Sequence, residues 1–247
     1  MKLQHITFTG IDEKTSVYAL KAIQREFPIA EFGVLFSHHW STNGHRYPSP
    51  NTVKKFLDQG LNLSAHLCGR IAKDAYNGIF DSVFEATNDV LMHRDFKRVQ
   101  LNVATYGSFY KGFKPHTKGR AIEFIIQQKS SSIEDTGAYQ RFKYCNPQLA
   151  VSMLVDASGG KGIDSGLDIV NTNEKIGYAG GINPDNVGDK LKTLLDNDLV
   201  GDFWIDMETG VRTDDWFDID KVYSVLQTCD EIIKISRKNS YPCSPFH

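Results

Sequence analysis

Three glycine-rich turns in the last third of the chain carry residues that could bind an anion. They are Val155–Gly162, Tyr178–Val187 and Ile205–Arg212. Glycine has no Cβ, so the backbone N–H groups of such turns can converge on a small anion such as phosphate. The turns match neither the G-x-G-x-x-G fingerprint nor a P-loop, and a Gly-Gly pair alone is often only a tight turn. The residues predicted to bind phosphate are Gly159, Gly160, Gly180, Gly181, Gly210 and Val211.

Short apolar segments that alternate with helical patterns must position these turns. Such alternation is typical of a parallel sheet with crossover helices, and 247 residues fit the size of one (β/α)8 barrel, roughly 250 residues. The sequence therefore predicts an α/β fold, a single-domain (β/α)8 TIM barrel over residues 1–247. The predicted strands are His5–Gly10, Glu31–Ser37, Leu61–Gly69, Arg98–Thr105, Ala121–Gln128, Val151–Ala157, Lys175–Gly180 and Asp202–Met207.

Helical spacing of apolar residues predicts helices between most of these strands. The first is expected over Glu13–Phe27 and the last over Asp218–Lys238, with Asp218 as its N-cap. Pro184 is expected to open the helix after the seventh strand. The glycine-rich, basic stretch Tyr106–Gly119 predicts an irregular loop in place of a fourth helix, and 239–247 an extended tail.

Alternate residues of a strand face opposite sides, which sorts the polar side chains. In the third strand His66 and Cys68 share the face opposite to the leucines, and in the fourth strand Gln100 lies opposite to Val99 and Leu101. In the eighth strand Asp206 and Glu208 form the inward set with Trp204. A polar interior near the carboxyl ends of the strands is typical of a barrel active site, although each residue alone also fits a hydrogen-bonded core.

The composition favours a small ligand over a large partner. The formal net charge is −2, and no lysine or arginine cluster is strong enough to follow a nucleic-acid backbone. No apolar run reaches the length of a signal peptide or membrane span, so a cytoplasmic setting is the default. The spacing of the four cysteines, and that of His38, His39 and His45, matches no metal site. No metal and no cofactor are therefore expected.

Five segments share their pattern with one barrel family. They are Ile6–Gly10; Phe32–Phe36 with Arg46–Pro50; Val99–Leu101; Asp156 with the glycines that follow it; and Gly180–Val187 with Asp206, Gly210 and Val211. In these segments the chain resembles phosphoribosylanthranilate isomerase, a (β/α)8 barrel of the tryptophan pathway that opens a furanose ring and moves a proton. The match is tightest over Gly180–Val187.

The resemblance implies roles for particular residues. Asp156 would be the general acid, and Arg46 would hold a substrate carboxylate through its planar guanidinium. Gly180, Gly181 and Gly210 would hold the phosphate. Gln100, Asp206 and Cys68 are further candidates for substrate binding, and family members occur as monomers and homodimers.

The chain departs from this family at the residue that would serve as the general base. The family's catalytic cysteine falls at Thr9, whose hydroxyl is too weak a base near neutral pH. His66, Glu208 and the less favoured Cys68 are the alternatives, because each is expected on the inward face. Glu208 and Arg212 also replace a small residue and an acid around the last glycine.

Three functions follow from this pattern. The first is an isomerase-type acid/base enzyme acting on a phosphorylated sugar with an unusual base. The second is a barrel that binds such a ligand without turnover, as a sensor. The third is a lyase or epimerase on the same phosphate-binding scaffold, since function lies in the site and not in the fold.

Overall fold

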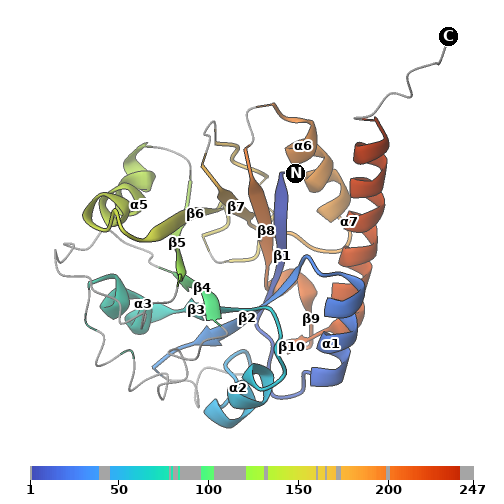
Figure 1. Cartoon of the computed structure of the whole chain (residues 1–247), viewed down its shortest axis with the longest axis horizontal. Helices are drawn as coiled ribbons and strands as arrows, with labels where there is room; N and C mark the ends of the chain where they lie inside the picture. The colour runs from blue at the N-terminus through green and yellow to red at the C-terminus, as the bar shows by residue number, and fades with distance from the viewer. Residues whose placement is uncertain are drawn as a thin grey trace.

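Eight parallel strands close into a barrel in the order of the chain. Figure 1 shows the labelled strands at the centre of the molecule. The computed structural model describes residues 2–38, 45–77, 79, 83, 96–102, 121–130, 133–159, 161–164, 166–170, 174–198 and 201–239. The strands are β1 (Leu3–Thr9), β2 (Ala30–Phe36), β3 (Leu63–Leu67), β4 (Phe96–Leu101), β5 (Glu123–Gln128), β6 (Ala150–Asp156), β7 (Ile176–Ala179) and β8 (Phe203–Met207). The last strand pairs with the first, with Thr7 opposite Asp206, and this pairing closes the barrel.

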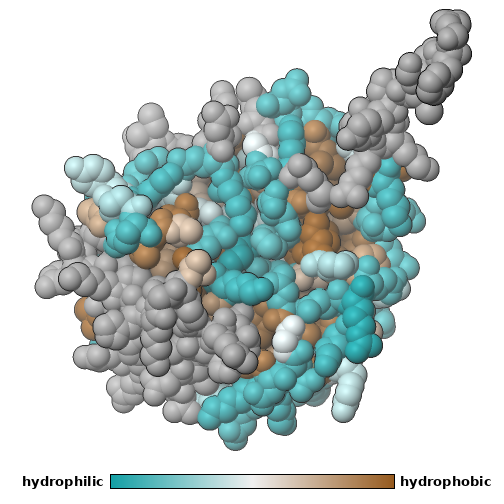
Figure 2. Space-filling model, viewed as in Figure 1, coloured by the Kyte–Doolittle hydropathy of each residue, from teal (hydrophilic) through white to brown (hydrophobic). Residues whose placement is uncertain are grey.

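Helices lie outside the barrel (Figure 1). Their apolar side chains join the core that covers the strands. They are α1 (Val17–Glu26), α2 (Pro50–Leu57), α3 (Gly69–Tyr76), α5 (Ile133–Cys145), α6 (Val187–Asp196) and α7 (Ile219–Asn239). Figure 2 shows hydrophilic side chains over the outer faces of α1 and α2, which is the pattern of amphipathic helices. No helix within the described ranges is both long and apolar enough to cross a membrane.

Local sequence signals explain where several helices begin. The Ser16 hydroxyl accepts a hydrogen bond from Ala19 N–H at the start of α1. Asp218 Oδ1 accepts bonds from the N–H groups of Asp220 and Lys221, so it caps α7 as predicted. Pro184 does not open α6, because three turn residues precede its first helical residue, Val187.

All eight predicted strands are confirmed, with ends that differ by a few residues from the expected ones. The predicted loop at Tyr106–Gly119 and the tail beyond residue 239 lie outside the described residues. After β8 the chain forms a short 3-10 helix, η2 (Thr209–Val211), and a small hairpin of β9 (Arg212–Thr213) and β10 (Trp216–Phe217).

An apolar layer fills the middle of the barrel. Trp204, Ile125 and Leu154 form a buried cluster with Ala179 packed against it. The Trp204 ring occupies the space beside Gly177, where a Cβ would lie 2.2 Å from the ring. Only glycine at position 177 therefore leaves room for the indole.

A charged layer lies below the apolar one, toward the amino ends of the strands. Arg98 donates to Glu31 at 2.7 Å and approaches Glu123 at 3.3 Å, and Lys175 donates to Glu123 at 2.8 Å. The Arg98 guanidinium lies 4.3 Å from the centre of the Trp204 ring. These two layers separate the amino end of the barrel from the polar residues at its carboxyl end.

Candidate functional site

A cavity of about 490 Å³ lies at the carboxyl ends of the strands. Twelve of the fourteen residues singled out from the sequence line it: Thr9, Arg46, His66, Cys68, Gln100, Asp156, Gly159, Gly180, Gly181, Asp206, Glu208 and Gly210. Gly160 lies outside the described residues. Residues selected from strand alternation and from the glycine turns, far apart in the chain, therefore lie in one cavity.

Val211 is the exception, because the prediction that it binds phosphate is wrong. It belongs to η2, is fully buried and does not line the cavity. Its N–H donates to the backbone oxygen of Glu208 at 3.3 Å. Because the turn after β8 tightens into a 3-10 helix, this amide serves the turn and is not presented to a ligand.

The turns after β6, β7 and β8 pack against one another through their glycines. A Cβ on Gly210 would lie 2.0 Å from the backbone oxygen of Ile182, and one on Gly181 would lie 2.3 Å from the nitrogen of Asp164. Gly180 and Gly181 have φ angles of +111° and +64°, a backbone region that residues with a Cβ rarely adopt. The sequence thus requires glycine both for conformation and for the close approach of the turns.

Asp156 ends β6 and is held by three hydrogen bonds. Its Oδ1 accepts from the N–H and the hydroxyl of Ser158 at 3.1 and 2.7 Å, and its Oδ2 accepts from the amide of Gln127 at 2.7 Å. Gln127 on β5 was missed by the sequence analysis, although it lies directly before the predicted end of that strand. The three donors fix the carboxylate at the cavity wall.

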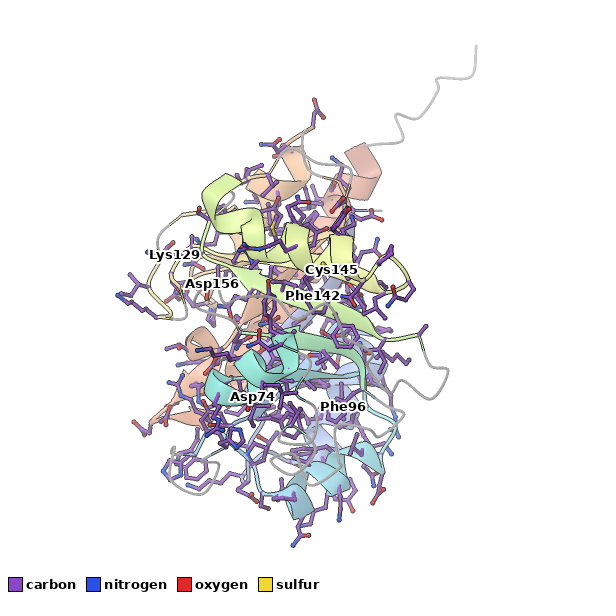
Figure 3. The ribbon with its side chains drawn as sticks, turned by 90° about the vertical axis from the view of Figure 1, so that its left-hand side faces the viewer. Asp74, Phe96, Lys129, Phe142, Cys145 and Asp156 are labelled. Carbon is purple, nitrogen blue, oxygen red and sulfur yellow. The ribbon has the colours of Figure 1, made fainter. Side chains whose placement is uncertain are left out.

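Lys129 was also missed, and it supplies a cation to the cavity. It follows β5, lines the cavity and lies against Gly159, where a Cβ would be 3.8 Å from its side chain. Figure 3 shows Lys129 and Asp156 on the same edge of the molecule. The position of Lys129 directly after the predicted end of the fifth strand could have indicated this in the sequence.

Thr9, Asp206 and His66 form a buried polar group at the cavity floor. The Thr9 hydroxyl donates to Asp206 Oδ1 at 2.7 Å, and the His66 ring lies 3.5 Å from that hydroxyl. Burial raises the pKa of Asp206 to about 8 and lowers the pKa of His66 to about 4. Both groups are therefore mainly uncharged near pH 7.

Arg46 reaches the cavity from the loop before α2 and is already paired. Its Nη1 donates to Glu208 Oε1 and its Nε to Asp215 Oδ1, both at 2.7 Å. Asp215 lies in the hairpin after β8, where Arg212 binds Asp12 at 2.9 Å in a buried ion pair. The guanidinium that was expected to meet a ligand carboxylate thus holds two carboxylates of the protein.

A directed chain of hydrogen bonds runs along the β3–β4 wall. The amide of Gln100 donates to Asn102 Oδ1 at 3.0 Å, and the Asn102 amide donates to Cys68 Sγ at 3.4 Å. Burial raises the pKa of Cys68 to about 12, so this thiol is no base near neutral pH. Gln100 Oε1 is buried without a hydrogen-bond partner among the described residues.

The histidines of the β2–α2 loop do not form a metal site where the structure describes them. His38 approaches Asp74 at 3.6 Å, and His45 stacks on Trp216 at 3.8 Å between ring centres. Across the described ranges, no group of three or more histidine, cysteine, aspartate or glutamate side chains is placed to hold a metal ion. His39 lies outside those ranges.

Fold and site together define a (β/α)8 barrel with a polar cavity at its carboxyl end. The family model described as N-(5'-phosphoribosyl)anthranilate isomerase matches residues 114–228. No curated protein matches the sequence. The match agrees with the resemblance seen in the sequence, over the C-terminal part of the chain.

Solved structures of such isomerases share the fold. The N-(5'-phosphoribosyl)anthranilate isomerase of Pyrococcus furiosus is 14% identical with a TM-score of 0.55, over 92% of this chain and 99% of its own. The enzyme of Thermotoga maritima is 16% identical with a TM-score of 0.55, over 93% and 100%. A third structure, at 16% identity and a TM-score of 0.53 over 93% and 100%, holds reduced 1-(o-carboxyphenylamino)-1-deoxyribulose 5-phosphate. At these identities the likeness concerns the fold.

Proposed function

We propose that this chain is an acid/base enzyme that acts on a small phosphorylated sugar, in an isomerase-type reaction. The observation that carries the proposal is the meeting of two carboxyl groups, Asp156 on β6 and Asp206 on β8, in the cavity that the glycine turns border. Proton transfer needs one group that gives a proton and one that accepts it. The solved relative with a bound sugar phosphate supports the same class of ligand.

The glycine turns after β7 and β8 are the proposed phosphate site. This is the usual position of a phosphate in a (β/α)8 barrel. Gly180, Gly181 and Gly210 border the cavity there, and Lys129 adds a positive charge on the neighbouring wall. A small doubly charged anion fits this combination of backbone and lysine better than a nucleic acid does.

The two carboxyl groups differ in a way that suits proton transfer. Asp206 is 5% exposed, and burial raises its pKa to about 8, so it is a proton donor at neutral pH. Asp156 accepts three hydrogen bonds and offers its carboxylate to a ligand. We therefore assign the donor role to Asp206 and the acceptor role to Asp156, the reverse of the role that the family resemblance implies for Asp156.

In the proposed reaction a sugar phosphate keeps all its atoms. Asp156 removes a proton from the carbon next to the carbonyl or masked carbonyl group, while Asp206 gives a proton to that group's oxygen. Asp156 then gives its proton to the former carbonyl carbon, while Asp206 takes the proton from the hydroxyl group on the carbon that was deprotonated. Both carboxyl groups return to their starting state, so the reaction needs no cofactor.

The other candidate bases fit this role less well. Burial lowers the pKa of His66 to about 4, which makes its neutral ring a weak base. Glu208 is bound to Arg46 at 2.7 Å. Both residues line the cavity, and we assign them to positioning the ligand.

A test is hydrogen exchange at carbon in heavy water, followed by NMR on a panel of pentose and hexose phosphates. We expect exchange and isomerisation with the wild-type chain, and losses of about 10² to 10⁴ in Asp156→Asn and Asp206→Asn, the usual range for such groups. Thermal stabilisation by inorganic phosphate should persist in both variants. Full exchange activity in either variant would remove that residue from the mechanism.

A ligand-binding barrel without turnover is the second candidate. Thr9 favours it, because a hydroxyl stands where the resembled family has its base. In that case a sugar phosphate would stabilise the wild-type chain, yet no carbon-bound hydrogen would exchange.

A further inference from the structure

Arg46 and its partners make the outer part of the cavity unfavourable for a carboxylate. The guanidinium is engaged by Glu208 through Nη1 and by Asp215 through Nε, at 2.7 Å each. The neighbouring Arg212 is paired with Asp12. The group of Arg46, Glu208 and Asp215 therefore carries a formal charge of −1. A ligand carboxylate would have to displace Glu208 or lie beside it, and like charges at such distances repel.

Gln100 gives an independent indication of what the ligand presents. Its side chain is 3% exposed and lines the cavity, and its Oε1 has no hydrogen-bond partner among the described residues. In this chain of hydrogen bonds Nε2 donates to Asn102 Oδ1, which leaves Oε1 as the atom that faces the cavity unpaired. A buried unpaired acceptor is costly unless a ligand completes it. Only a donor such as a hydroxyl or an amine can do so, and a carboxylate cannot.

These two features lie on one wall of the site. The Tyr47 side chain, next to Arg46, shares a hydrogen bond with Cys68, and Cys68 accepts from Asn102, the partner of Gln100. The side chains of Tyr47, Cys68 and Asn102 thus link the residue next to the paired arginine to the partner of Gln100. The glycine turns and Lys129 form the phosphate side of the same cavity.

We propose that the substrate is a polyhydroxylated or amino sugar phosphate whose end at Arg46 and Gln100 carries no carboxylate. The inference rests on the proposed function, since it takes the phosphate to be anchored at the glycine turns. It excludes an anthranilate-type substituent, which places a carboxylate on that end of the molecule.

The test compares two compounds that differ by one carboxyl group. They are reduced 1-(o-carboxyphenylamino)-1-deoxyribulose 5-phosphate and the same compound with an unsubstituted phenyl ring. Titration calorimetry with the wild-type chain should show the carboxyl-free compound binding about tenfold more tightly, the ratio that 1.4 kcal/mol represents. Glu208→Gln frees a donor of Arg46 and removes one negative charge, so this variant should abolish or reverse the preference. Gln100→Leu, which removes the acceptor, should weaken binding of both compounds.

The outcomes separate this inference from the proposed function. Tighter binding of the carboxylated compound to the wild-type chain would overturn the inference and leave the phosphate site intact. The same holds if inorganic phosphate stabilises the chain and neither compound binds. If neither compound binds and inorganic phosphate also has no effect, both the inference and the proposed function fail. Glu208 is one-third exposed, so its substitution should not prevent folding, and circular dichroism checks this.

Discussion

The hydroxyl of Thr9 donates a hydrogen bond of 2.7 Å to Oδ1 of Asp206, across the pair of strands that closes the barrel. Burial raises the pKa of Asp206 to about 8, and the hydrogen bond from Thr9 acts against this rise. In the proposed reaction, Asp206 on β8 and not Thr9 on β1 is therefore the group that carries the proton.

The first prediction concerns the pH dependence of stability. Asp206 has a pKa near 8 in the folded chain and 3.8 as its ordinary value, so the folded state binds more protons between these limits. The contribution of Asp206 to the free energy of unfolding should be complete below about pH 4. It should fall as pH rises toward 8, by at most about 1.4 kcal/mol per pH unit. His66, with its pKa lowered from 6.5 to about 4, acts in the opposite direction between those two values.

The window from pH 6.5 to 8 therefore isolates Asp206 from His66. Urea unfolding at pH 6.5, 7.2 and 8 should show the free energy of unfolding falling in the wild-type chain and changing less in Asp206→Asn. Parallel slopes for the two proteins would mean that Asp206 is already ionised at pH 6.5.

The second prediction concerns the contact between the turns after β7 and β8. A methyl group in Gly210→Ala would lie 2.0 Å from the backbone oxygen of Ile182, so the two turns must separate. We expect a destabilisation of about 1–3 kcal/mol, the usual cost of overpacking, and loss of the thermal stabilisation by inorganic phosphate.

Gly188→Ala is the matched control for this substitution. Its methyl group would lie 3.4 Å from Thr228, at ordinary contact distance, near the start of α6. Its stability should stay within about 1 kcal/mol of the wild type or rise, because alanine favours helix. Phosphate stabilisation that survives in Gly210→Ala would place the phosphate elsewhere.

The third prediction concerns the reconstruction of the family's activity. Thr9→Cys restores a thiol at the position of the family's base, and Glu208→Gln frees Arg46 for a carboxylate. We expect phosphoribosylanthranilate isomerase activity in the double variant, at least about tenfold above Thr9→Cys alone. A fluorescence assay of phosphoribosylanthranilate consumption measures it. Activity of the unmodified chain in that assay would show that Thr9 does not disable the reaction.

The fourth prediction concerns the ion pair that ties β1 to the hairpin after β8. Asp12 is fully buried and accepts from Arg212 at 2.9 Å and from the N–H of Phe217 at 2.7 Å. Asp12→Ala removes the closest carboxylate partner of the buried Arg212 guanidinium, and breaking a buried pair in this way costs about 3–5 kcal/mol. Asp230→Ala, which removes an exposed pair with Lys234, should cost about 0.5 kcal/mol or less. Equal effects of the two substitutions in urea unfolding would contradict this account.

Most of the barrel was predictable because its signals are local. Alternation along β3 and β8 predicted that His66, Asp206 and Glu208 lie inside the barrel. The glycines of the turns indicated backbone conformations that other residues rarely adopt. The partners of these groups were not predictable, since they depend on long-range packing. Asp215 holds Arg46 from 169 positions away, and Gln127 reaches Asp156 from the neighbouring strand. Pro184 was misjudged because proline suits a turn before a helix as well as a first helical residue.

The indole of Trp204, seated against Gly177 above the Arg98 layer, has a consequence for traffic through the molecule. The indole closes the cavity toward the barrel axis, so a ligand cannot pass along the axis to the amino end of the barrel. In the proposed reaction, reactant and product would therefore both enter and leave on the carboxyl side of the barrel.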